Sequence, residues 1–144
     1  MLTQEIAKEI VKQTTIRLNR NINIMDEKGT IIASGNPDRI NQAHFGAIEV
    51  LKTGKPLIIH EQDRHHWLGV LPGINLPIEF QKVIIGVIGI TGDPAELKEF
   101  GELVKMITEM LLNQSFMAEQ FEWKQHLKEL FLKTYLRKRL IKIR

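Results

Sequence analysis

Residues 71–92 read LPGINLPIEFQKVIIGVIGITG and join a proline-rich segment to the most apolar run of the chain. The run from Val83 to Ile90 contains only Val, Ile and Gly, a composition typical of a buried strand. In the preceding segment, Pro72, Gly73 and Pro77 bracket an Ile-Asn-Leu triplet, and this pattern predicts a rigid turn. We therefore expect the apolar run to be the core strand and the proline-rich segment to be a turn beside it.

The other elements are predicted from hydrophobic periodicity and from turn residues. Alternating apolar residues around the turn at Gly29 indicate a β-hairpin, because Gly29 can supply the positive φ that such loops need. Asp93, Pro94 and Glu96 form a capping box that begins a long helix. The remaining expected elements are a helix over about 3–15, a short helix over 40–54, and strands over 55–61 and 67–72.

This order of elements favours an α+β fold. An antiparallel five-stranded sheet flanked by helices, with a long C-terminal helix, fits a PAS-like sensor domain. A doubly wound sheet fits poorly, because the chain lacks alternating strand and helix units of sufficient length. We expect a ligand-binding domain over residues 1–115 and a basic helical linker or tail over residues 116–144.

Composition excludes several classes of protein. The chain has 144 residues, 43% of them hydrophobic, which is enough for one compact domain with its own core. It has no cysteine, so disulfides and thiolate metal sites are absent. The N-terminus has no signal-peptide pattern, and the longest apolar run is eight residues, far too short for a membrane span. A cytoplasmic protein without membrane contact is expected.

The C-terminal tail carries a concentrated positive charge. Residues 124–144 have a net charge of +7, whereas the rest of the chain has −4. The tail could be a solvated helix face, or it could touch nucleic acid. Residues 116–130 also repeat apolar side chains at near-heptad spacing, which favours a homodimeric coiled coil over a tail that folds back as a separate helix.

No enzyme motif is present. The chain lacks G-x-S-x-G, a P-loop, G-x-G-x-x-G and H-E-x-x-H, so we expect neither catalysis nor a cofactor. The segment HEQDRHHW, residues 60–67, contains residue types that bind zinc or nickel, but adjacent histidines point to opposite sides of an extended chain. A polar loop is the expected interpretation, and no metal site is predicted.

The segment SGNPDRIN, residues 34–41, has the features of an anion site. Asn36 can cap a helical turn that Pro37 opens, and such a turn leaves backbone N–H groups free. Arg39 adds a guanidinium group that matches a carboxylate, and Ser34 adds a hydroxyl just upstream. The alternative is an ordinary capped turn with an exposed arginine. His44, expected one turn further on, is either part of this site or a surface histidine.

The proline-rich segment could form the opposite wall of a pocket. Gly73 would allow close approach of a ligand, while Ile74 and Leu76 would expose backbone N–H groups and Asn75 an amide. Two glycines in the following strand leave room on the sheet face. The alternative is a tight turn without a ligand.

Three separated stretches, ASGNPDRINQAHFGA, LPGINLPIEF and VIIGVIGITGDPAEL, resemble the N-terminal sugar-diacid recognition domain of carbohydrate diacid regulators. The resemblance covers roughly residues 2–122 and implies a cytoplasmic sensor of glucarate, galactarate or glycerate. Full-length relatives end in a DNA-binding helix-turn-helix that this chain is too short to contain, so DNA contact is expected only through a longer parent. The alternative function is a DNA-binding or dimerisation protein that acts through its basic C-terminal helix. A third class, an enzyme acting on small hydroxy acids, has no supporting residues.

The resemblance also implies a set of ligand-binding residues. They are Ser34, Arg39, His44, Gly73, Ile74, Asn75, Leu76 and Gly92.

Overall fold

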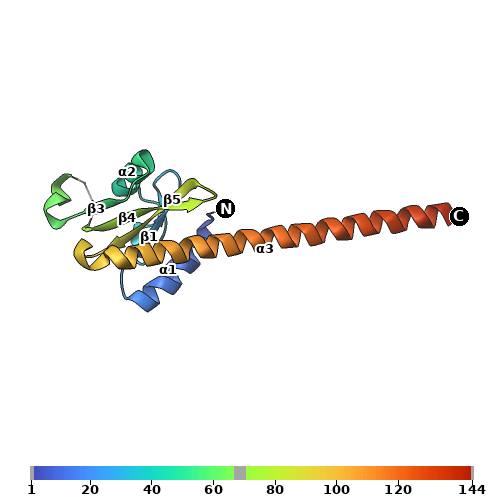
Figure 1. The fold of residues 1–144 in the computed structure, drawn as a ribbon, viewed down its shortest axis with the longest axis horizontal. Helices are drawn as coiled ribbons and strands as arrows, with labels where there is room; N and C mark the ends of the chain where they lie inside the picture. Colours follow the sequence, from blue (N-terminus) through green and yellow to red (C-terminus); the bar gives the residue numbers. More distant parts are fainter. Residues whose placement is uncertain (1, 67–70, 144) are drawn as a thin grey trace. The chain divides into compact units, whose positions relative to one another are not determined.

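The computed structural model describes residues 2–66 and 71–143. Within this part of the chain, five strands form one antiparallel sheet in the order β2-β1-β5-β4-β3 (Figure 1). The elements are α1 (Gln4–Leu18), β1 (Ile22–Met25), β2 (Ile31–Ser34), η1 (Pro37–Arg39), α2 (Phe45–Thr53), β3 (Leu57–Ile59), η2 (Glu61–His66), β4 (Gly73–Phe80), β5 (Val83–Thr91) and α3 (Pro94–Ile143). The predicted mixed fold, with an antiparallel five-stranded sheet and a long C-terminal helix, is therefore confirmed.

The N-terminal helix and hairpin form as their sequence signals predict. Thr3 caps α1, and its side chain accepts a hydrogen bond from the Ile6 N–H at 3.2 Å. In the hairpin turn, the Asp26 carboxylate accepts from the backbone N–H of Thr30 at 3.0 Å, and Gly29 has φ of 84°. This turn fixes the antiparallel pairing of β1 with β2.

The proline-rich segment is a strand, and the predicted turn is wrong. β4 pairs with β5 along its full length, from Gly73 opposite Thr91 to Phe80 opposite Val83. The strand tolerates Pro77 because β3 is short: its pairing with β4 ends at Asn75, so no β3 residue lies opposite Pro77. The strand predicted over 67–72 falls mostly on residues 67–70, which lie outside the described residues.

The two faces of the sheet differ in chemistry. Since side chains alternate along a strand, Met25, Val87 and Pro77 share one face, where α2 packs Ala47 and Val50 onto the core. The other face is formed by isoleucines and leucines, where α1 packs against β1 and β2 and the start of α3 approaches β4. The close approach of α3 requires Gly101, because a Cβ there would lie 2.1 Å from Ile74 Cδ1 and 3.2 Å from Leu76 Cδ1.

The helix expected over 40–54 begins later than predicted. α2 starts at Phe45, and His44 is its N-cap instead of an internal residue. The preceding residues are extended or turned, with Asn41 at φ of 75° and a β-bridge between Thr30 and Ala43. The C-terminal stop at Gly54, in the left-handed conformation, is as predicted.

The long helix α3 begins at the predicted capping signal. The Asp93 carboxylate accepts from the Ala95 N–H at 3.0 Å, while Glu96 pairs with Arg20 at 3.2 Å. The chain divides into two compact units, residues 1–112 and 113–144. In the part of the chain that the structure describes, no helix is long and apolar enough to cross a membrane.

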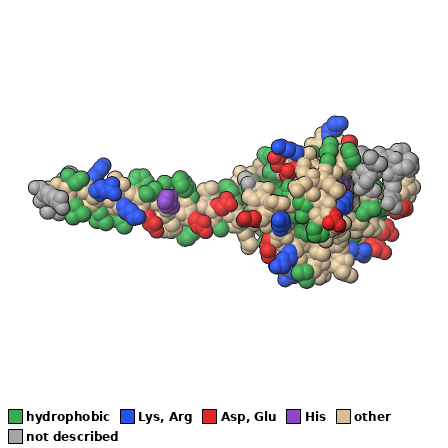
Figure 2. Space-filling model, turned by 180° about the vertical axis from the view of Figure 1, so that it is seen from behind, with side chains coloured by type: hydrophobic (Ala, Val, Ile, Leu, Met, Phe, Trp, Pro, Cys, Tyr) green, Lys and Arg blue, Asp and Glu red, His purple; other side chains and the backbone are tan. Residues whose placement is uncertain are grey.

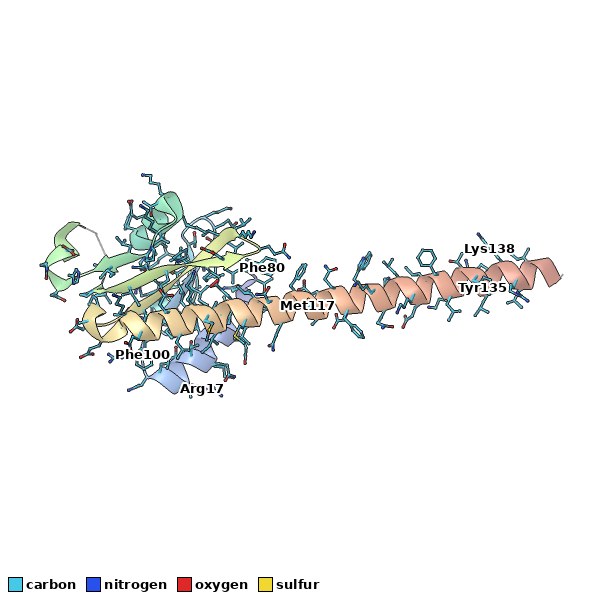
Figure 3. All side chains as sticks on the ribbon, in the orientation of Figure 1. Arg17, Phe80, Phe100, Met117, Tyr135 and Lys138 are labelled. Carbon is cyan, nitrogen blue, oxygen red and sulfur yellow. The ribbon has the colours of Figure 1, made fainter. Side chains whose placement is uncertain are left out.

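The described residues of the second unit form the C-terminal part of α3. Figure 3 shows side chains projecting from it around its circumference, among them Met117, Tyr135 and Lys138. Its large apolar side chains are mostly exposed, and Figure 2 shows hydrophobic patches along it. Those described as exposed are Met117, Phe121, Trp123, Leu130, Phe131, Leu132, Tyr135, Leu136, Leu140 and Ile141.

Candidate ligand-binding site

A polar region interrupts the apolar face of the sheet that α2 covers. Asn23, Gly89 and Asn75 are directly opposite one another on β1, β5 and β4, so they form one row across the sheet. Thr91 and Gly73 form the next row. Arg39 and His44 reach this region from η1 and the start of α2. The resulting small pocket is lined by Asn23, Arg39, His44, Leu71, Gly73, Ile74, Asn75, Gly89, Ile90 and Thr91.

Asn75 is a buried polar side chain at the centre of this pocket. It is only 3% exposed, and among the described residues no hydrogen bond satisfies its amide. Two glycines make room for it: a Cβ added at Gly89 would lie 2.9 Å from Asn75 Oδ1, and one at Gly46 would lie 3.1 Å from Nδ2. Because the amide faces the free space of the pocket, it can form hydrogen bonds with a polar ligand or water there.

His44 is held neutral by its surroundings. Its Nδ1 accepts a hydrogen bond from the Ala47 N–H at 3.1 Å, so the proton of the neutral ring is on Nε2. Burial, followed by the nearby charge of Arg39, lowers the pKa of His44 to about 4. The ring is therefore a hydrogen-bond donor in the pocket and carries no charge at neutral pH.

Arg39 supplies the positive charge of the pocket. The Asn36 side chain caps η1 by accepting from the Asp38 N–H at 3.2 Å, and Arg39 ends that turn. The guanidinium is partly buried, which lowers the pKa of Arg39 although the group remains charged. Among the described residues, no acidic side chain pairs with Arg39 and none lines the pocket. A partly buried cation without a counter-charge favours an anionic ligand.

Asn23 belongs to the pocket although sequence reasoning did not identify it. It is 1% exposed, and its Oδ1 accepts a hydrogen bond from the Ser34 hydroxyl. Ser34 in turn accepts from the Asn36 N–H at 3.0 Å. The available signal was an asparagine between two isoleucines in INIM, the four residues that form the buried strand β1.

The free space of the pocket is small. It amounts to about 10 Å³, which holds roughly one water molecule. A larger hollow of about 570 Å³ adjoins it, and Leu71 and Thr91 line both. Any sugar acid must therefore widen the inner pocket or extend into the neighbouring hollow.

The eight predicted residues divide between several places. Arg39, His44, Gly73, Ile74 and Asn75 line the polar pocket. Gly92 lines the adjoining hollow, and Ser34 lines a separate hollow between α1 and β2. The Leu76 side chain lies on the opposite face of the sheet, against α3.

The expected roles of the β4 residues also change. Ile74 is paired with both Ile58 and Ile90, so its backbone groups serve the sheet and are not free turn amides. Gly73 is required by its neighbour, because a Cβ there would lie 2.1 Å from the Ile90 carbonyl oxygen.

In the described part of the histidine-rich segment, a side chain caps the short helix η2. The His60 N–H donates to the Asp63 carboxylate at 3.2 Å, at the start of η2. Among the described residues, no group of three His, Asp or Glu side chains could hold a metal ion.

The chain is similar in sequence to one family model and to three longer proteins. Residues 2–135 match the family described as "Putative sugar diacid recognition". The chain is 45% identical over 114 residues to the carbohydrate diacid regulator of Escherichia coli, covering 79% of this chain and 30% of that protein. It is 40% identical to an uncharacterized protein of Haemophilus influenzae and 36% identical to YsfB of Bacillus subtilis, covering 91% of this chain and 36% of each relative. The chain thus spans about a third of the length of these relatives.

Comparison with solved structures identifies the fold as that of GAF domains, which are related to PAS domains. The GAF domain of A. aeolicus Nlh2 has a TM-score of 0.54 and 20% identity, over 80% of this chain and 87% of that one. The GAF domain of the nutrient sensor CodY from Clostridium difficile has a TM-score of 0.51 and 12% identity, over 73% and 83%. The PAS-like prediction is thereby refined. Since the family match extends over residues 2–135, the chain belongs to the sugar diacid recognition family.

Proposed function

We propose that this chain is the ligand-sensing domain of a transcriptional regulator and binds a sugar diacid or a related hydroxy acid, such as glucarate, galactarate or glycerate. The observation that carries the proposal is the unpaired charge of Arg39 in a pocket that, among the described residues, contains no acid. The regulator name of the Escherichia coli relative and the sensor role of the CodY domain are consistent with it.

The geometry supports a defined binding mode. Arg39 would bind one carboxylate of the ligand, with the planar guanidinium donating to both oxygens. The Nε2–H of His44 would add a neutral donor to the same group. Asn75, which can both donate and accept, would bind a hydroxyl next to the carboxylate. The hydroxylated part of an extended acid would pass Leu71 and Thr91 into the adjoining hollow, where His60 and Gln62 are the polar residues that suit a second carboxylate better than Glu61 and Asp93 do.

Catalysis is not part of the proposal. His44 is the only histidine that lines the polar pocket among the described residues, and the Ala47 N–H occupies the ring nitrogen that could act as a base. The pocket side chains Asn23, Arg39 and Asn75 are binding groups that neither attack nor accept protons at neutral pH. A sensor therefore fits these residues better than an enzyme does.

The test is calorimetric titration of the chain and its Arg39→Ala and Arg39→Lys variants with D-glucarate, galactarate and D-glycerate. Hydrogen bonds to charged groups are worth about 1.5–3 kcal/mol, so Arg39→Ala should weaken binding by about 10- to 100-fold. Arg39→Lys should restore only part of the affinity, because an ammonium group lacks the planar fork.

Arg17→Ala is the matched control. Arg17 is an exposed arginine on α1 whose side chain contacts Gln13, outside the polar pocket. This variant removes the same charge and should bind as the parent does. Circular dichroism should show both arginine-to-alanine variants folded. Unchanged affinity in a folded Arg39→Ala variant, or no binding of any of the three acids by the parent chain, would contradict the proposal.

A further inference from the structure

Ser34 connects the turn that carries Arg39 to the amide of Asn23. Its hydroxyl oxygen accepts a hydrogen bond from the Asn36 N–H at 3.0 Å, and its single hydrogen is donated to Asn23 Oδ1. Because Ser34 uses this carbonyl oxygen, the two hydrogens on Asn23 Nδ2 remain for the pocket. Asn23 is 1% exposed, so its amide is surrounded by protein and cannot reorient into bulk water.

The same pattern of free donors occurs at His44 and at Arg39 itself. The Ala47 N–H occupies Nδ1 of His44, and only the Nε2–H of that ring is available. The guanidinium of Arg39 has donors and no acceptor. Asn23, Arg39 and His44, three of the pocket's polar side chains, thus offer mainly hydrogen-bond donors to a ligand. Of the pocket's remaining side chains, Asn75 and Thr91 can accept.

We infer that Asn23 is a specificity-determining residue whose amide is positioned by Ser34 to donate to the ligand, and that Asn23, Arg39 and His44 together favour an ionised carboxylate over a carboxamide. This inference rests on the proposed function and adds which chemical form of the acid is bound. A carboxylate only accepts hydrogen bonds, so each of its oxygens can meet a donor. A carboxamide brings an NH₂ group, which Asn23, Arg39 and His44 cannot satisfy and which must find its acceptor at Asn75 or Thr91.

Ser34 therefore has a different role from direct ligand contact. It lines the hollow between α1 and β2, and its hydroxyl contacts the pocket residue Asn23. Without its hydroxyl, the Asn23 amide is free to turn its oxygen toward the ligand. An amide that presents either end would bind a carboxamide better than the parent does and a carboxylate less well.

The experiment compares D-glucarate with its diamide, D-glucaramide, on the full chain and on the Asn23→Asp and Ser34→Ala variants. The parent should prefer glucarate by about 10-fold or more, the effect of one unpaired group at a charged site. Asn23→Asp replaces the donor with a carboxylate of nearly the same shape, so glucarate affinity should fall by about 10-fold or more while glucaramide affinity changes little. Ser34→Ala should reduce the preference for glucarate by several-fold, mainly by improving glucaramide binding.

The control variant is Asn19→Asp, which makes the same chemical change at an exposed position at the end of α1 and should keep the parental preference. Thermal melts establish which variants are folded, and Ser34→Ala alone decides the matter should Asn23→Asp fail to fold. Folded variants with the parental preference, or a parent that binds both compounds equally, would overturn the inference and leave the proposed sensor function intact. A parent that binds neither glucarate nor the other acids would overturn both.

Discussion

Burial and charge act together on Arg39 and His44. Both side chains lie at the polar pocket, and both have a pKa that burial lowers. Arg39 keeps its charge because its ordinary pKa is so high, whereas His44 loses its proton well before neutral pH. The result is one positive charge and one neutral donor in the same small pocket. This combination suits a single carboxylate better than two histidine or arginine charges, which would repel each other.

The first prediction at this scale concerns pH. The pKa of His44 is about 4 in the folded chain, below the ordinary value of 6.5, so the unfolded chain binds this proton more readily. The stabilising contribution is complete above pH 6.5 and is lost as pH falls toward 4. Protonation of His44 should make the free energy of unfolding about 2 kcal/mol lower at pH 5 than at neutral pH. Thermal melts between pH 7.5 and 5 should show a steeper loss of stability for the parent than for His44→Asn.

The asparagine variant is chosen because it removes the titrating group while keeping a capping residue for α2. Loss of carboxylate interactions at low pH affects both proteins equally, so the difference between their slopes reports His44. Parallel slopes would mean that His44 is protonated in the folded chain as easily as in the unfolded one.

The sequence predicted the charged part of the pocket, but it did not predict that Asn23, Gly89 and Asn75 form one row across the sheet. Arg39 was recognisable because a capped turn next to a guanidinium group is a local pattern. Asn23 can be recognised as a polar residue between two isoleucines, but its role depends on which residues lie opposite it in the sheet. That neighbour is Gly89, with Asn75 beyond it, and neither pairing can be worked out from local sequence. The sequence therefore identifies individual residues of this row but does not show that they lie side by side.

At the scale of the element, β4 shows how tertiary context overrides turn signals. Proline in a strand removes a backbone donor, so a segment with Pro72 and Pro77 predicts a turn. The cost is avoided because β3 is only three residues long and leaves β4 unpaired on that side beyond Asn75. In addition, the Lys105 ammonium group donates to the Pro77 carbonyl. The length of β3, which decides the matter, is not evident in the sequence of β4.

The row across β1, β5 and β4 gives a prediction for Gly89→Ala. The new methyl group would lie 2.9 Å from Asn75 Oδ1 and 3.3 Å from Met25 Cε, so the Asn75 amide must move. We expect binding of D-glucarate to weaken by about 10-fold, and stability to fall by about 1 kcal/mol, at the low end for overpacking. Val83→Thr, at an exposed position of the same strand, is the control and should change neither quantity. Parental affinity in Gly89→Ala would show that the ligand does not use Asn75.

The two compact units differ in how their apolar side chains are placed: the first buries most of them in a core, and the second exposes most of them to solvent. Residues 1–112 contain the sheet, its buried isoleucines and the candidate site. Residues 113–144 contain exposed aromatic and aliphatic side chains together with all of the basic residues of the tail. The helix of this second unit was predicted correctly, because the segment contains no glycine or proline and repeats its apolar residues at helical spacing. What covers its apolar side chains is a question of assembly, which periodicity alone does not answer.

The final prediction concerns that assembly. Large exposed apolar side chains on a helix favour association, and a second copy of the chain is the partner that near-heptad spacing suggests. A chain shortened to residues 1–115 should therefore sediment as a monomer at concentrations where the full chain self-associates. It should still bind D-glucarate with the parental affinity, since every residue of the candidate site precedes the cut. Sedimentation velocity and calorimetry on both chains provide the comparison. A shortened chain that self-associates like the parent would place the contact within residues 1–115, and one that neither folds nor binds would make the tail part of the sensor's own core.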